Sequence, residues 1–287
     1  MRQIHSQMDY LCHKVPLGKF TSRHRQQVEH LLTNILHQYQ RHTTPQTHPQ
    51  QKSRLFFQLM DRLCHEAEFI QQQHPHQSNI RPSYDPDCGE LRHSPTSFLA
   101  IHGLKLGTLL SSVWKDEYLA AIRKQSEDLS FTPVQVSERI VRYIHAGLLQ
   151  NATPFPFSLV LHAIRATADP TQAHLLAQPI FYQTCMHDLG QRYHRDFQPN
   201  VFVTNEMMHI WANSAVDGAA SQAEELLQYI TQRYRAQPTD PINLQPNAMI
   251  YTTLMKVHAN EAKGKMGGSE TSILPLASLA WTFMSVV

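Results

Sequence analysis

The amino-acid sequence predicts an all-α fold, an α-α superhelix (solenoid) of antiparallel helical hairpins. Three observations predict it: apolar residues recur at helical spacing, stretches that alternate apolar and polar residues are few, and one segment repeats at a fixed offset. Glycine, which tight strand turns favour, totals only 10 of 287 residues. A helical hairpin buries its apolar stripe only against stacked neighbours, which is the physical basis of a solenoid.

Helical spacing is clear in the first half of the chain. Apolar residues follow one helix face in 23–40 and again in 52–71. The polar, proline-containing stretches 41–51 and 72–94 read as loops. Further helices are expected around 98–104, at 114–125 and from Pro133 to residue 148, because proline is tolerated in the first turn of a helix.

Composition bounds the class of protein. Hydrophobic residues make up 41% of the chain, which argues against wholesale disorder. The formal net charge is only +2, which is lower than that of proteins that bind nucleic acids strongly. The 19 histidines add positive charge at acidic pH. No run of about 18 apolar residues occurs, so we expect no membrane partner.

Motifs of catalysis and metal binding are missing from the sequence. The four cysteines form no CxxC pair, and no phosphate-binding glycine-rich loop or nucleophile elbow occurs. His65-Glu66 begins like a zinc-protease motif, but Phe69 stands where the second histidine belongs. We therefore expect no catalytic residue, no cofactor and no metal site.

The internal repeat lies between residues 151 and 262. The segment PNVFVTNEMMHIWANS starts at Pro199, and PNAMIYTTLMKVHANE starts at Pro246, an offset of 246 minus 199, or 47. A weaker copy, TPFPFSLVLHAIRAT, starts at Thr153 with an offset of 46. Between the strong copies, 218–234 carries another helical stripe, which Asp217 is expected to cap and Gly218 to introduce with a turn.

These residues resemble the pentatricopeptide-repeat family. The resemblance rests on Pro199-Asn200, Asn205, the stretch 223–227 and Pro246-Asn247, and the spacing resembles long-loop algal and protist members. It implies a right-handed superhelix that binds single-stranded RNA, with about one base read per repeat by two or three side chains. It also implies a role in RNA processing, stability or translation in a mitochondrion or plastid, together with other ribonucleoprotein components.

The resemblance also assigns base-reading residues. One reader stands near the start of the first helix and one at the end of the repeat, which gives Asn205 with Asn247, a pair that resembles a pyrimidine-reading combination. The next unit offers Thr252. The preceding unit offers Leu159 with Asn200, but the Leu159 side chain cannot hydrogen-bond to a base.

Polar stripes accompany these residues. Positions i, i+4 and i+8 share one helix face, and two such stripes line up across consecutive units in a stacked array. The stripes are Asn205, His209 and Asn213, and Thr252, Lys256 and Asn260. The family often has a basic residue that binds phosphate at the positions of Asn213 and Asn260. Here Lys256, Arg165 and Arg142 are expected to take over that role in part. Trp211 lies on the apolar stripe and is expected in the core.

The chain divides into five predicted regions. Residues 1–22, with a basic bias, suit an organelle-targeting segment or an ordinary basic N-terminus. Residues 23–94 hold two helices and a polar linker, 95–150 a helical region that could contain degenerate repeats, and 151–262 the repeats. The apolar tail 263–287 is an odd cap for a solenoid, and we hypothesise a truncated or misread gene model.

Two other functions are compatible with the sequence. One is a tetratricopeptide-like scaffold for protein–protein interaction, although its signature Trp, Leu-Gly and Tyr spacing is missing from the first helices. The other is an organelle ribonucleoprotein subunit that does not read bases. The low net charge is compatible with both functions. If the protein does not enter an organelle, we expect it to be an intracellular soluble protein.

Overall fold

The computed structural model describes residues 2–19, 21, 23–24, 27–28, 30–31, 50–73, 97–124, 131–146, 148–149, 154–182, 200–214, 216–236 and 245–266. Within these residues the regular elements are helices and no strand occurs, so the predicted all-α class is confirmed for this part of the chain. The chain forms two compact units, Met1–Ala152 and Thr153–Val287.

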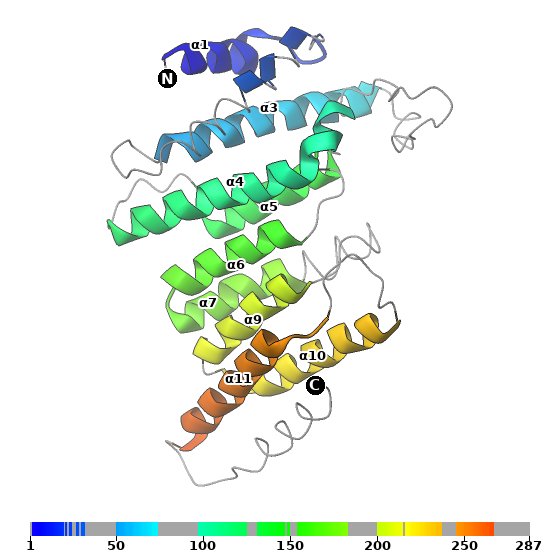
Figure 1. The fold of residues 1–287 in the computed structure, drawn as a ribbon. Coiled ribbons are helices and arrows are strands. Elements are labelled where there is room, and N and C mark those ends of the chain that lie inside the picture. Colours follow the sequence, from blue (N-terminus) through cyan, green and yellow to red (C-terminus); the bar gives the residue numbers. More distant parts are fainter. Residues whose placement is uncertain are drawn as a thin grey trace. The chain divides into compact units, whose positions relative to one another are not determined.

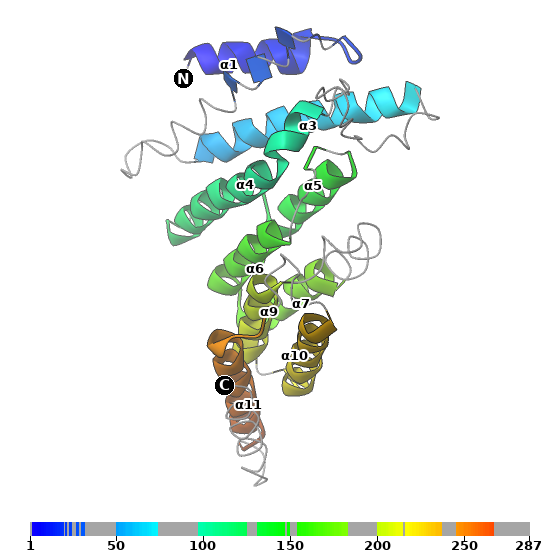
Figure 2. The same cartoon turned by 45° about the vertical axis from the view of Figure 1, so that its right-hand side comes forward.

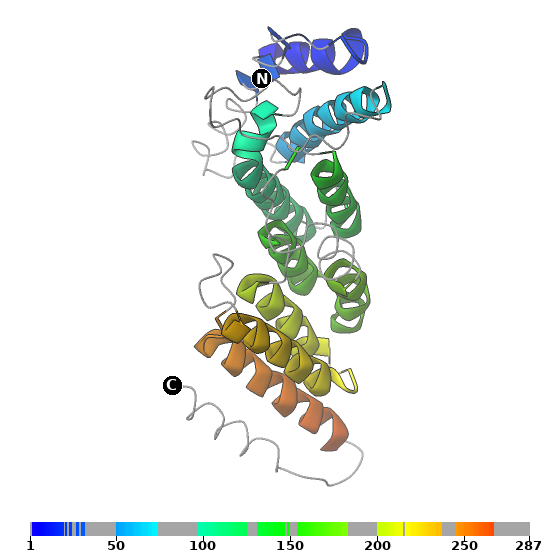
Figure 3. The same ribbon diagram turned by 90° about the vertical axis from the view of Figure 1, so that its right-hand side faces the viewer.

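Unit 1 is centred on one long helix. Its elements are α1 (Arg2–Asp9), the short π-helix η1 (Tyr10–Lys14), α3 (Gln50–Gln73), α4 (Ser97–Arg123) and α5 (Pro133–His145). The helix α3 packs against η1, α4 and α5, and it lies between α1 and α4 in the views of Figure 1 and Figure 3. The expected helices at 98–104 and 114–125 are parts of one continuous helix, α4, because the single glycine between them, Gly107, weakens a helix without ending it.

A buried ion pair fastens the N-terminal segment to α3. The guanidinium of Arg62 donates to the backbone carbonyls of Leu11 (3.2 Å) and Val15 (2.8 Å) and pairs with Glu66 at 3.1 Å. Both carboxylate oxygens of Glu66 lie 3.0 Å from the backbone nitrogen of Gly18, which donates to them. The predicted targeting segment 1–22 therefore includes residues that pack within unit 1.

The start of α5 follows the sequence prediction. Pro133 occupies the first turn, and the preceding Thr132 caps the helix. The Thr132 hydroxyl accepts from the backbone N–H of Gln135, and the Gln135 side chain accepts from the backbone N–H of Thr132, so each satisfies a donor of the other.

Unit 2 contains two helical hairpins and a further helix. Its elements are α6 (Phe155–Thr167), α7 (Pro170–Gln178), α9 (Val201–Ser214), α10 (Ala219–Ala236) and α11 (Ala248–Met266). The helix α9 contacts each of the other four, and it lies between α6 and α11 in Figure 1 and Figure 2. Its apolar face is fully buried and includes Trp211, which confirms the expected core position of this indole.

Both strong copies of the repeat start a helix in the same way. The side-chain oxygen of Asn200 accepts from the backbone N–H groups of the second and third residues that follow it, at 3.1 and 3.0 Å. Asn247 does the same at the start of α11, at 3.1 and 3.2 Å. The repeated asparagine is therefore a helix N-cap, which satisfies backbone donors that have no partner inside the helix.

The turn into α10 depends on α11. Gly218 has a φ of 78°, a left-handed conformation that glycine adopts without steric cost. The carboxylate of Glu261, on α11, accepts from the backbone nitrogens of Gly218 (3.3 Å) and Ala220 (2.8 Å). The sequence pattern predicted that Asp217 caps α10. In the structure, the carboxylate of Glu261 from the next repeat lies at the start of α10.

Several predictions fall on residues that the structure does not describe. They concern most of the helix 23–40, the loops 41–51 and 72–94 apart from their residues in α3, and the tail after residue 266. In the part of the chain that is described, no helix is long and apolar enough to span a membrane.

Candidate functional site

An apolar row crosses the N-terminal ends of α6, α9 and α11. Its members are Phe155, Phe202 and Met249, and each follows the previous one by 47 residues. Phe202 and Met249 are each 43% exposed, and the rings of Phe155 and Phe202 meet edge to face with centroids 5.5 Å apart. Large apolar side chains lying outside the core at the same point of successive repeats indicate a surface that does more than support the fold.

Two further rows lie along the same helices at the same offset. The amide–hydroxyl row is Ser158, Asn205 and Thr252, and the basic row is His162, His209 and Lys256. Interhelical contacts agree with this offset, because the pairs His162–Glu206 and His209–Thr253 both span 44 residues. The contacts therefore place Ser158, and not the Leu159 suggested by an offset of 46, in correspondence with Asn205.

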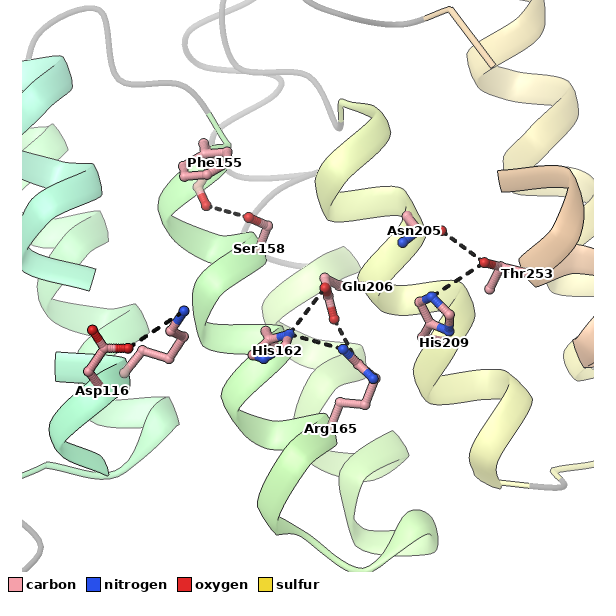
Figure 4. A network of polar contacts seen from close by, with 10 residues as sticks. Asp116, Phe155, Ser158, His162, Arg165, Asn205, Glu206, His209 and Thr253 are labelled. Carbon is pink, nitrogen blue, oxygen red and sulfur yellow. Dashed lines mark hydrogen bonds and ion pairs between the residues drawn. The ribbon is translucent and has the colours of Figure 1, made fainter. Parts of the chain in front are cut away.

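Asn205 faces the next repeat. Its side chain is 6% exposed, and its Oδ1 lies 3.0 Å from the hydroxyl of Thr253 on α11. Figure 4 shows Asn205 and Glu206 turned from α9 toward opposite neighbours, α11 and α6. The Thr253 hydroxyl also lies 2.9 Å from the backbone oxygen of Met249 and 3.4 Å from Nε2 of His209. The carboxamide oxygen expected to read a base is thus part of a helix–helix contact.

The polar stripe of α11 is more open than that of α9. Thr252 and Lys256 are exposed, and the Thr252 hydroxyl donates to the backbone oxygen of Ala248 at 2.7 Å. Asn260 is half-buried and donates to the backbone oxygen of Ala212 at 2.7 Å. The difference arises because α11 covers one face of α9, whereas the corresponding face of α11 remains exposed at Thr252 and Lys256.

The other predicted residues also have defined surroundings. Asn200 is 7% exposed and Asn247 is exposed, but both side-chain oxygens cap helices, so base reading by these oxygens requires loss of a cap. Asn213 is exposed near the end of α9. Arg142 belongs to unit 1, where it binds both carboxylate oxygens of Glu68 at 2.7 and 2.6 Å.

A charged cluster links α6 to α9. The Nε of Arg165 lies 2.9 Å from one oxygen of Glu206, and Nδ1 of His162 lies 3.3 Å from the other. Burial raises the pKa of the Glu206 carboxyl, but the hydrogen bond with His162 and the charge of Arg165 outweigh burial and hold that pKa below its ordinary value. Glu206 is therefore ionised at neutral pH.

The neighbouring imidazole is held neutral. Burial lowers the pKa of His209, and the charges of Arg165 and Lys256 lower it further, while the charge of Glu206 opposes them. His209 therefore takes up a proton only below the pH at which a free imidazole does.

Sequence reasoning missed seven residues of this surface: Phe155, Ser158, His162, Phe202, Glu206, Met249 and Thr253. Phe202 and Met249 were detectable, since they recur at the offset of 47 while standing off the buried stripe. The roles of Glu206 and Thr253 depend on which helices flank α9, which residue spacing alone does not give. Within the described residues, no group of three or more histidine, cysteine, aspartate or glutamate side chains could hold a metal ion.

No protein-family model, curated protein or solved structure matches this chain.

Proposed function

We propose that unit 2 is part of a pentatricopeptide-like solenoid that binds single-stranded RNA across α6, α9 and α11. One observation carries the proposal: the three helices present an apolar row, an amide–hydroxyl row and a basic row in a common register. A ligand that suits this surface carries three complementary kinds of group repeated along its length: flat apolar faces, hydrogen-bonding edges and negative charges.

Single-stranded RNA has that composition. Its bases stack on aromatic and apolar side chains, a contact worth about 1–3 kcal/mol per base, and the apolar row supplies exposed groups of this kind. Base edges accept and donate hydrogen bonds, and within the amide–hydroxyl row Thr252 is exposed for such a contact, whereas Ser158 and Asn205 are buried. The phosphates are anions, and the basic row lies seven residues, about two helical turns, along each helix from the apolar row.

Base reading by Asn205 has a cost on this surface. Its Oδ1 contacts Thr253, so a base that hydrogen-bonds to this oxygen displaces the Thr253 hydroxyl. Thr252 is exposed and requires no such displacement. We therefore expect stacking to contribute more to affinity than base reading does, and base preference to be weak.

The cellular role is proposed from the family resemblance: processing, stability or translation of RNA in a mitochondrion or plastid. Protein–protein scaffolding is the competing function. It is favoured if the exposed apolar groups bind a protein and RNA does not compete for them.

The test is binding of the full chain to labelled single-stranded RNA pools and to duplex RNA over a range of salt concentrations. We expect tighter binding to single strands, affinity that falls as salt rises, and a roughly tenfold loss for Phe202→Ala. Leu175→Ala is the matched control, because Leu175 is an exposed apolar residue on α7 outside the three rows. Equal affinity for duplex and single strands, or equal loss in both variants, contradicts the proposal.

A further inference from the structure

The second half of α4, in unit 1, has the same burial pattern as α6 at the offset of 47 residues. On α4 the following residues are at most 5% exposed: Leu110, Ser111, Val113, Trp114 and Glu117. The residues 47 positions later on α6 are buried to the same degree: Phe157, Ser158, Val160, Leu161 and Ile164. The helix α4 is therefore built in the register of the first helices of the repeats in unit 2.

Neighbouring offsets do not give this match. An offset of 46 would pair Lys115, which is half-buried, with the fully buried Leu161. An offset of 48 would pair the buried Trp114 with His162, whose side chain is 35% exposed. The offset that relates α6, α9 and α11 to one another is thus also the offset that relates α4 to them.

The second helices that follow α4 and α6 also begin alike. Both α5 and α7 start with a proline, and the residue before it caps the helix. The hydroxyl of Thr132 and the carboxylate of Asp169 each accept from a backbone N–H of the first turn, at 3.3 and 3.0 Å. Nε1 of Trp114 donates to the backbone oxygen of Phe131 at 3.1 Å, which joins α4 to the start of α5. The order of elements and caps in α4 and α5 is therefore that of a further repeat.

This register gives Lys115 the position on α4 that the basic row has on the other helices, 47 residues before His162. The Lys115 side chain is 21% exposed, and its Nζ lies 3.8 Å from Oδ1 of Asp116, whose side chain is 55% exposed. Asp116 departs from the match with α6, since it is exposed where Ala163 is buried. Ion pairs between side chains in contact with solvent are weak and are screened by salt. A phosphate group can therefore replace Asp116 as the partner of Lys115.

We propose that Lys115 binds a phosphate group of single-stranded RNA. This role rests on the proposed function and extends RNA contact to unit 1. Ser111, which corresponds to the amide–hydroxyl row, is fully buried, so α4 adds a phosphate contact and no base contact at this position. Phosphate contacts carry no sequence information, and the contribution of Lys115 should be the same for RNAs of different sequence.

The experiment measures the affinity of the full chain for a labelled single-stranded RNA pool over a range of salt concentrations. We expect Lys115→Gln to weaken binding roughly fivefold near physiological salt, the upper end of the range for an exposed ion pair. The plot of log affinity against log salt should also become less steep by about 0.7, the value for one phosphate contact on a single strand. Lys115→Arg keeps the charge and should keep most of the affinity.

The matched control is Lys124→Gln, which removes the same charge from an exposed lysine just after the end of α4. Lys124 lies about 13 Å further along the helix direction, beyond the screening length of about 8 Å at physiological salt, so its loss should change affinity little. Asp116→Asn should strengthen binding, because it removes the carboxylate that competes with phosphate for Lys115.

A second measurement observes the lysine directly. Reductive methylation with a carbon-13 label keeps the charge of each lysine and gives it an NMR signal. The signal of Lys115 is assigned by its absence from Lys115→Arg. We expect this signal to shift when single-stranded RNA is added and the signal of Lys124 to stay in place.

Two outcomes overturn the role of Lys115: equal losses of affinity in Lys115→Gln and Lys124→Gln, or a Lys115 signal that RNA does not shift. If Phe202→Ala still weakens RNA binding in that case, the proposed function of unit 2 stands and only the extension to unit 1 fails. If the wild-type chain binds no single-stranded RNA at any salt concentration, both fail together.

Discussion

The hydroxyl of Thr253 on α11 lies 3.0 Å from Oδ1 of Asn205 on α9. This contact joins the first helices of two successive repeats at a position that the family resemblance assigns to base reading. Helix packing and RNA recognition therefore compete for one carboxamide oxygen. The competition can be measured, because the hydroxyl can be removed without changing the size of the side chain.

Thr253→Val should raise RNA affinity and lower stability. The substitution removes the hydroxyl that hydrogen-bonds to Oδ1 of Asn205, so a base no longer has to displace this hydroxyl. We therefore expect roughly threefold tighter RNA binding. The buried oxygen loses its partner in the free protein, which costs about 1 kcal/mol of unfolding free energy. Thr231→Val on α10 is the matched control, since the Thr231 hydroxyl donates to a backbone oxygen of its own helix. Weaker RNA binding by Thr253→Val would argue that Asn205 reads no base.

Asn200→Ala and Asn247→Ala should each destabilise unit 2. Both side chains cap helices, and loss of such a cap costs about 1 kcal/mol, measurable by urea unfolding. Asn200→Asp keeps an acceptor at the same place and should retain most of the stability. If the alanine variants unfold like wild type and only base preference changes, these residues are readers and not caps.

Arg62→Ala should release the N-terminal segment from α3. Arg62 is buried and binds backbone carbonyls of that segment as well as Glu66, and breaking a buried ion pair costs about 3 kcal/mol. Limited proteolysis should then cut between residues 14 and 20 faster than in wild type. Arg54→Ala, at an exposed position of α3, is the control. Unchanged cleavage would show that the segment is held by its apolar contacts alone.

His209 should make unit 2 less stable in acid. Burial lowers its folded-state pKa below the unfolded value of about 6.5, so the folded state binds fewer protons. The stability that this provides is complete above the unfolded pKa and is lost as the pH falls through the folded pKa. Urea unfolding from pH 7.5 to 5 should therefore show a smaller decline for His209→Gln than for wild type. Parallel declines would contradict the prediction.

Sequence reasoning predicted the local structure well where one signal repeats. The Pro-Asn dipeptides correctly marked the starts of α9 and α11, because a capping asparagine acts on the backbone donors next to it. The stripe at 52–71 and Pro133 likewise predicted α3 and α5. Each of these signals depends on residues within about one turn of each other.

The contacts between helices were not predictable in the same way. Asn205 and Thr252 occupy equivalent positions in the sequence, yet Asn205 is buried and Thr252 is exposed, because α11 packs over α9. The cap of α10 by Glu261 also joins residues more than 40 positions apart. To predict such contacts, one must know the register of one helix against the next. For α6 the sequence left this register uncertain by one residue, because the weaker copy of the repeat gave an offset of 46 and not 47.

Methyl NMR of methionine can show whether RNA binds across the rows of α6, α9 and α11. Met249 lies in the apolar row at 43% exposure, and Leu175→Met places a reporter methyl group on α7 outside it. On addition of single-stranded RNA, we expect a shift of the Met249 methyl signal and an unchanged signal from the α7 reporter. A shift at the reporter with none at Met249 would contradict binding across these rows.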